Sequence, residues 1–143
     1  MKSPDEVMRD LVRRWLAKAE EDFGVAARLL SEQGPYLSAI GFHSQQAAEK
    51  FLKAVLVRHQ IDFPKTHDIK ELLNLVATVD AILAEPLRIA VPLTPYGVDI
   101  RYPDDFPALD LDDARTAVSL AATVRESVLR HLERYLNEGS PPA

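Results

Sequence analysis

The chain has 143 residues, of which 47% are hydrophobic and 27% charged, a balance typical of one globular domain with a sizeable core. It contains no cysteine, which excludes a disulfide framework, a thiolate metal site and a cysteine nucleophile. The net charge of −5 disfavours general attraction to nucleic acid or anionic lipid. The sequence has no apolar run long enough to span a membrane and no signal-peptide core, so we expect a cytoplasmic protein without membrane contact.

The first predicted helix covers residues 5–31, and it begins after Ser3 or at Asp5, either of which can cap it. One side of this helix is apolar except for Asp22. The pair Gly34-Pro35 ends it.

The second predicted helix, residues 36–60, carries a polar band beside an apolar face. The band consists of His43, Gln45, Gln46, Glu49, Lys50 and Lys53. Successive residues of an α-helix lie about 100° apart, which places Ala39, Phe42 and Val57 inside this polar arc. A solvated face rarely needs a phenylalanine, so we expect a loop, a second chain or a ligand to pack on the band.

Two further helices are predicted before a long loop. Thr66 is the expected N-cap of the third, and a shorter helix over residues 80–92 is expected to end near Pro92. Residues 93–110 read as a proline-rich loop, and long ordered loops are often functional.

The last predicted helix starts at the cap Asp110 and runs to about residue 137, before a disordered tail over residues 138–143. There is no strand pattern and no internal repeat. The sequence therefore predicts an all-α fold: a single domain with its core over about residues 10–137, built as an up-and-down bundle of four to five helices.

Three charged residues lie where helical geometry predicts burial: Asp22, Lys50 and Arg125. Unpaired buried charges are costly, so we expect them to neutralise one another. They fit either an internal ion-pair network that fixes helix register or a polar cleft that holds a phosphate or a partner's charge. Both interpretations require Asp22 to lie close to a cation.

Spacing argues against several chemistries. The four histidines, His43, His59, His67 and His131, are scattered and form neither a Glu-x-x-His nor a His-Glu-x-x-His pattern, so no metal and no cofactor is expected. The five glycines occur singly, which leaves no phosphate-binding loop, and no Gly-x-Ser-x-Gly elbow is present. His67 is expected to pack the turn at a helix start.

The loop offers a different possibility. Arg101 is flanked by Tyr96 and Tyr102 and followed by Asp104, so a forked donor lies beside aromatic faces, which suits phosphate or base contact. Alternatively, Arg101 anchors the loop by pairing with a carboxylate such as Asp22 or Glu49.

Taken together, these residues resemble the HEPN domain family over residues 10–135. The resemblance rests on Trp15…Ala19…Asp22, on the segment 42–54 (Phe-His-Ser-Gln-Gln-Ala-Ala-Glu-Lys-Phe-Leu-Lys-Ala), on the Thr66-His67-Asp68-Ile69 turn, and on Tyr96…Arg101-Tyr102-Pro103-Asp104. It implies a helical bundle that usually dimerises, like the substrate-binding subunits of nucleotidyltransferases. Prokaryotic members are commonly encoded beside a small nucleotidyltransferase, as its substrate-binding or toxin partner.

The resemblance also raises the question of ribonuclease activity, which depends on a short sequence motif. Many members are metal-independent ribonucleases whose motif is an arginine, four to six residues and then a histidine. After Arg101 the corresponding positions are Phe106, Pro107 and Ala108. Arg125 and His131 have an allowed spacing, but within one helix their side chains point about 120° apart.

Three hypotheses follow. The leading one is a homodimeric, non-enzymatic HEPN protein that binds a nucleotide, RNA or partner and acts with a small nucleotidyltransferase in a toxin–antitoxin-like pair. Its site would use Arg101, Tyr102, Asp104, Tyr96, Lys50, Lys53, Gln46 and His43, with Asp22, Glu49 and Arg125 as a structural charge network. The alternatives are a ribonuclease toxin with a degenerate motif and a structural helical adaptor.

Overall fold

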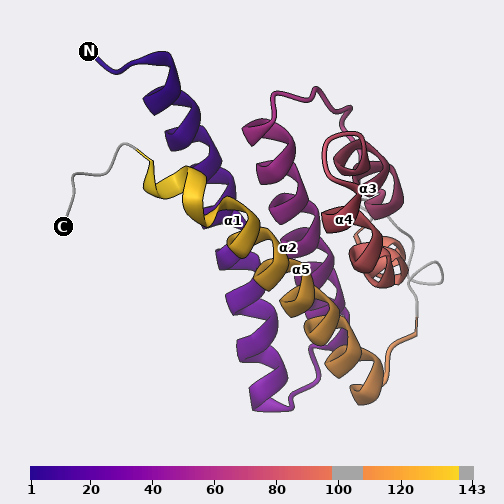
Figure 1. Ribbon diagram of the computed structural model, residues 1–143. Coiled ribbons are helices and arrows are strands. Elements are labelled where there is room, and N and C mark those ends of the chain that lie inside the picture. The colour runs from indigo at the N-terminus through magenta and orange to yellow at the C-terminus, as the bar shows by residue number, and fades with distance from the viewer. Residues whose placement is uncertain (98–107, 139–143) are drawn as a thin grey trace.

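The computed structural model describes residues 1–97 and 108–138, and within these ranges the chain is helical and has no strand (Figure 1). The elements are α1 (Pro4–Glu32), α2 (Leu37–Arg58), α3 (Ile69–Ala77), α4 (Ala81–Ala84), the 3₁₀ helix η1 (Glu85–Tyr96) and α5 (Leu111–Asn137). The predicted all-α bundle is therefore confirmed. The expected disordered tail covers residues 138–143, of which residues 139–143 lie outside the described residues.

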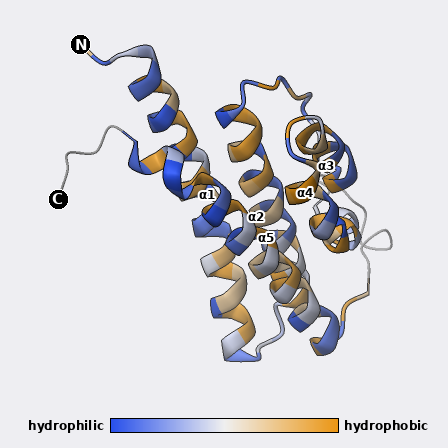
Figure 2. Cartoon of the chain, in the orientation of Figure 1, coloured by the Kyte–Doolittle hydropathy of each residue, from blue (hydrophilic) through white to orange (hydrophobic). Residues whose placement is uncertain are grey.

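Three long helices build the bundle, and α2 lies at its centre. Helix α1 packs along α2, α5 crosses both, and α3, α4 and η1 gather on the other side of α2 (Figure 1). Figure 2 shows apolar residues on inward-facing sides of the helices, with polar residues outward. The core is made of large fully buried side chains from nearly every element, among them Val12, Ile40, Phe51, Leu52, Leu72, Leu87 and Leu132. No helix among the described residues is long and apolar enough to cross a membrane.

The caps of the two outer long helices follow the prediction. The Ser3 hydroxyl accepts a hydrogen bond from the backbone N–H of Glu6, and Asp110 and Asp113 form a reciprocal capping box at the start of α5. These bonds satisfy N–H groups that have no partner within the helix.

The predicted cap of the third helix was wrong by two residues. Asp68 caps α3 by accepting from the backbone N–H of Lys70. The Thr66 hydroxyl instead accepts from the N–H of Asp68 and donates to Glu71. Thr66 therefore stabilises the turn before the helix, because α3 begins at Ile69, directly after its cap Asp68.

The short helix expected over residues 80–92 is also different. Helix α4 is a single turn, and the chain then winds as the 3₁₀ helix η1 through Pro92 and Pro95 to Tyr96. Proline has no backbone N–H to donate to a carbonyl one turn earlier, so a regular α-helix does not continue through this stretch. Short connecting segments of this kind often wind as 3₁₀ helices. As a result Tyr96, predicted in the loop, ends η1, and its ring packs against the backbone of Gly41 on α2.

Candidate functional site on α2

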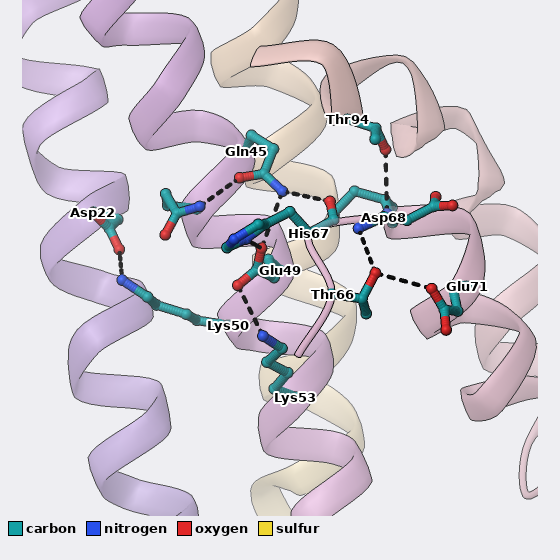
Figure 3. Close-up of polar contacts among 12 residues, drawn as sticks. Asp22, Gln45, Glu49, Lys50, Lys53, Thr66, His67, Asp68, Glu71 and Thr94 are labelled. Carbon is teal, nitrogen blue, oxygen red and sulfur yellow. Dashed lines mark hydrogen bonds and ion pairs between the residues drawn. The ribbon is translucent and has the colours of Figure 1, made fainter. Parts of the chain in front are cut away.

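The polar band of α2 divides into two groups that face different neighbours (Figure 3). His43 and Lys50 reach α1, where both contact Asp22. Gln45, Glu49 and Lys53 are spaced one helical turn apart and face the segment between α2 and α3. We call Asp22, His43 and Lys50 the open cluster, and Gln45, Glu49, Lys53 and His67 the closed cluster.

The open cluster is built around one carboxylate. Asp22 Oδ1 lies 2.8 Å from His43 Nδ1, and Asp22 Oδ2 lies 2.5 Å from Lys50 Nζ. The expectation that Asp22 lies close to a cation is thus confirmed. The side chains of His43 and Lys50 are 29% and 24% exposed, so a ligand in solvent can reach both. Since Nδ1 must present its N–H to the carboxylate, a neutral His43 has its lone pair on Nε2.

The closed cluster is centred on Glu49, whose side chain is only 4% exposed. Its Oε2 lies 2.9 Å from Lys53 Nζ, and its Oε1 lies 2.6 Å from His67 Nδ1. The amide of Gln45 donates to Glu49 and to the backbone carbonyl of His67. His67 therefore fixes the turn before α3 to α2, in line with the packing role expected from sequence.

Lys53 differs from Lys50 in its surroundings. Its side chain is 9% exposed, and its ammonium lies 5.8 Å from the ring centroid of Trp15 and 5.5 Å from that of Phe63. Aromatic faces stabilise a cation in this position. The charge of Lys53 is consequently satisfied within the bundle.

Gln46 and the residue after η1 both pack on the closed cluster at Gln45. Gln46 donates to Gln45 Oε1 over 2.7 Å. A Cβ added at Gly97 would lie 2.0 Å from the same oxygen, so a side chain on the residue after η1 would displace the Gln45 amide. The packing that the band was expected to receive therefore comes in part from the chain itself, over the closed cluster.

Arg125 was expected to join Asp22, and this was wrong. Arg125 makes a forked contact with Glu20 on α1, Nε to Oε1 at 2.5 Å and Nη2 to Oε2 at 3.0 Å. The hydrogen bond to Glu20 raises the pKa of Arg125. Its long side chain runs to the edge of the α1–α5 contact and is 33% exposed, instead of entering the core near Asp22.

Arg125 and His131 also do not converge. His131 Nε2 lies 2.9 Å from His59 Nε2, and His131 Nδ1 lies 3.6 Å from Asp80 Oδ2. The two residues thus have separate partners, as their rotation around α5 indicates. Sequence reasoning missed Glu20, Asp80 and the His59–His131 pair, because these contacts depend on how α5 crosses the other helices.

The site residues predicted on the loop before α5 lie largely outside the described part of the chain. Arg101, Tyr102 and Asp104 lie outside the described residues. Tyr96 is half-buried beside α2, and burial raises the pKa of its hydroxyl. Within the described ranges, no group of three or more histidine or acidic side chains is arranged to hold a metal ion.

Comparison with known families agrees with this architecture. The family model described as the HEPN domain matches residues 12–132, which include α2, Asp22 and most of α5. The chain belongs to the HEPN domain family. This HEPN chain is also similar to a solved structure, that of TT1696 from Thermus thermophilus, with a TM-score of 0.63 and 31% sequence identity over 83% of this chain and 96% of that one. A comparison with curated proteins gave no match.

Proposed function

We propose that this HEPN chain is a nucleotide-binding module that acts with a small nucleotidyltransferase and carries no ribonuclease activity. The observation that supports it best is the open cluster, where an ammonium and an imidazole lie side by side at the surface of the α1–α2 pair. Phosphate groups are commonly bound by such donors.

The candidate residues are not equally able to meet a ligand. Lys50 and His43 are partly exposed, and half-buried Gln46 lies between the clusters. Lys53 is enclosed by Glu49 and two aromatic rings, so a phosphate would have to break a buried ion pair to reach it. The proposal therefore assigns ligand contact to Lys50, His43 and Gln46 and leaves Lys53 in the scaffold.

The charge balance of the open cluster sets a further requirement. Asp22 already neutralises Lys50, so the cluster alone offers little net positive charge to an anion. A bound phosphate would need a second cation, and Arg101 is the residue we assign to this role, with Tyr96 or Tyr102 stacking on the base. This assignment rests on the sequence, because Arg101 and Tyr102 lie outside the described residues.

The nucleotide part of the proposal is tested by calorimetric titration of ATP into wild-type protein and an Arg101→Ala variant. We expect saturable binding by the wild type and a loss of about tenfold or more in the variant, since a charge-assisted contact contributes about 1.5–3 kcal/mol. An Arg101→Ala variant that keeps full affinity for the nucleotide would rule out this clamp.

The partner part needs a separate experiment. Co-expression with the product of the neighbouring gene, which the proposal takes to be a small nucleotidyltransferase, should give a complex that survives size-exclusion chromatography. Light scattering on the free chain should report a homodimer. A strict monomer that never co-purifies with its genomic neighbour would contradict this half of the proposal.

The ribonuclease alternative makes an opposite prediction. Incubation of pure protein with RNA in the presence of a chelator should give no cleavage, because Arg125 and His131 engage separate partners. Cleavage that disappears in both Arg101→Ala and His131→Ala would reverse the ranking of the two functions.

A further inference from the structure

A pair of imidazoles, away from the polar band of α2, joins the end of α2 to α5. His59, the residue after α2, and His131 on α5 face one another head-on, with their Nε2 atoms 2.9 Å apart and their rings tilted by 44°. Leu132, the next residue on α5, is fully buried in the core. Two nitrogens at this distance share a single proton, so one ring donates its Nε2–H and the other accepts on a bare Nε2.

Asp80 determines which ring donates. Its Oδ2 lies 3.6 Å from His131 Nδ1, while its Oδ1 accepts from the backbone N–H of Leu83 as the N-cap of α4. A carboxylate beside Nδ1 of His131 favours a proton on that atom, which leaves the Nε2 of a neutral His131 bare. The hydrogen bond therefore runs from Nε2–H of His59 to Nε2 of His131.

The number of added protons determines whether this hydrogen bond survives. A first added proton goes to the bare Nδ1 of His59 and leaves its Nε2–H in place, so the bond persists with a charged donor. A second must go to Nε2 of His131, which is the atom that accepts the bond. Two cationic rings then point N–H groups at each other across 2.9 Å, and like charges at such a distance repel.

Charged groups on α2, on α5 and before α4 act on this pair. The C-terminal end of α2 and Asp80 attract a proton, Arg58 repels one, and Arg130, exposed on α5 beside the groove that His131 lines, is a further cation. Burial is the largest influence and lowers the pKa of both rings, and the other imidazole and Arg58 lower that of His59 further. The folded chain thus takes up protons here less readily than an unfolded chain does.

His131 has room to move when the hydrogen bond breaks. It lines a groove of about 490 Å³ whose other walls include Asp80, Leu83 and Pro86. A cationic His131 can turn toward Asp80 and replace the 3.6 Å approach by a charge-assisted hydrogen bond. This rotation would leave His59 without its partner on α5.

We propose that the His59–His131 pair is a pH-sensitive joint, which holds α2 and α5 together while it carries at most one extra proton and releases them when both rings are cationic. Neither histidine belongs to the open or the closed cluster, so the joint is independent of the proposed nucleotide site. Its stabilising effect is complete above the ordinary histidine pKa of about 6.5, and it is lost as the pH falls from there through the lower pKa values of the folded state.

The test is urea unfolding between about pH 7.5 and about pH 5 of the wild type and of the double variant His59→Gln/His131→Gln, whose amides can hydrogen-bond but do not titrate. Over this range we expect the folding equilibrium constant of the wild type to fall by about tenfold or more relative to that of the double variant, because the unfolded state binds up to two more protons. An equal pH dependence of the two proteins would overturn the proposal.

An NMR titration of the ring nitrogens in the wild type avoids any folding defect in the variants. The two rings should titrate in separate steps, both below their ordinary pKa, and amide hydrogen exchange at the end of α2 should accelerate with the second step. In Asp80→Asn, whose amide oxygen can still cap α4, the His131 step should move to lower pH because the attracting charge is gone. Rings that titrate independently near about pH 6.5, or amide exchange that stays constant as they titrate, would show that there is no such joint.

Discussion

Asp22 joins α1 to α2 through both oxygens of its carboxylate. Each of its carboxylate oxygens has its own partner, His43 or Lys50, and its side chain is only 13% exposed. Glu49 contacts three side chains on another face of α2: Lys53, His67 and Gln45. The interior of this bundle thus keeps its charges because each carboxylate is fully hydrogen-bonded.

Replacing Asp22 by Asn should lower the free energy of unfolding by about 1–3 kcal/mol, since it leaves a partly buried Lys50 without its counter-charge. The matched control is Glu21→Gln, one residue away, whose side chain is 71% exposed and which should change stability by less than about 0.5 kcal/mol. Urea unfolding measures both. Equal effects in the two variants would show that the open cluster adds nothing to stability.

Glu49→Gln should cost more, about 3–5 kcal/mol, because it removes one partner of a buried pair and leaves the Lys53 ammonium uncompensated. The same urea experiment tests this. The Glu49→Gln/Lys53→Met double variant should recover part of the loss, since neither charge is then left alone. A single variant within about 1 kcal/mol of wild type is incompatible with the closed cluster as described.

Sequence reasoning succeeded for Asp22 and failed for Arg125 for one physical reason. Helical spacing shows on which face of the helix a residue lies, and the short side chain of Asp22 stays on that face. Arginine is long enough to leave the face that its Cα occupies, so its partner depends on the crossing of α5 over α1. Glu20, at the edge of that contact, could not be identified from helical spacing alone.

At the scale of elements, the end of η1 packs closely on α2 because Gly97 has no side chain. Gly97→Ala would place a Cβ 2.0 Å from the fully buried Gln45 amide, so Gln45 must move and give up its bonds to Glu49 and His67. We expect a loss of about 1–3 kcal/mol in thermal or urea unfolding.

Gly24→Ala is the matched control, with the opposite sign. Gly24 lies inside α1 with nothing within 4 Å of an added Cβ, so alanine should stabilise the helix by about 0.5–1 kcal/mol. If both alanine variants stabilise the protein, the packing of Gly97 on Gln45 is not as the structure places it.

The long helices were predictable and the short ones were not. Helices α1, α2 and α5 have many turns of regular apolar spacing and clear end signals, so their limits agree with the prediction to within two residues. The stretch over α4 and η1 holds prolines at positions 86, 92 and 95, and it winds mostly as a 3₁₀ helix packed against α2 and α3. Such winding leaves no long periodic signal.

At the scale of the whole molecule, α1 and α5 are joined near the two ends of the chain (Figure 1). Arg9 and Arg13 donate to the backbone carbonyls of Tyr135 and Leu136 in the last turn of α5, where carbonyl groups lack their usual partners within the helix. The Tyr135 carbonyl also accepts from the backbone N–H of Glu138. The bundle thereby forms one frame in which α2 presents its polar band between α1 on one side and the turn before α3 on the other. Of the residues that carry the HEPN resemblance, Trp15, Ala19 and Asp22 on α1 and the segment 42–54 on α2 belong to this frame.

The central claim is that the open cluster contacts a nucleotide phosphate through Lys50. The most direct measurement is the dissociation constant of ATP for Lys50→Met compared with Lys70→Met, an exposed lysine on α3. The account predicts that Lys50→Met weakens binding by about tenfold, as expected for one charge-assisted contact, while Lys70→Met binds as wild type does. Equal affinities in the two variants would contradict it.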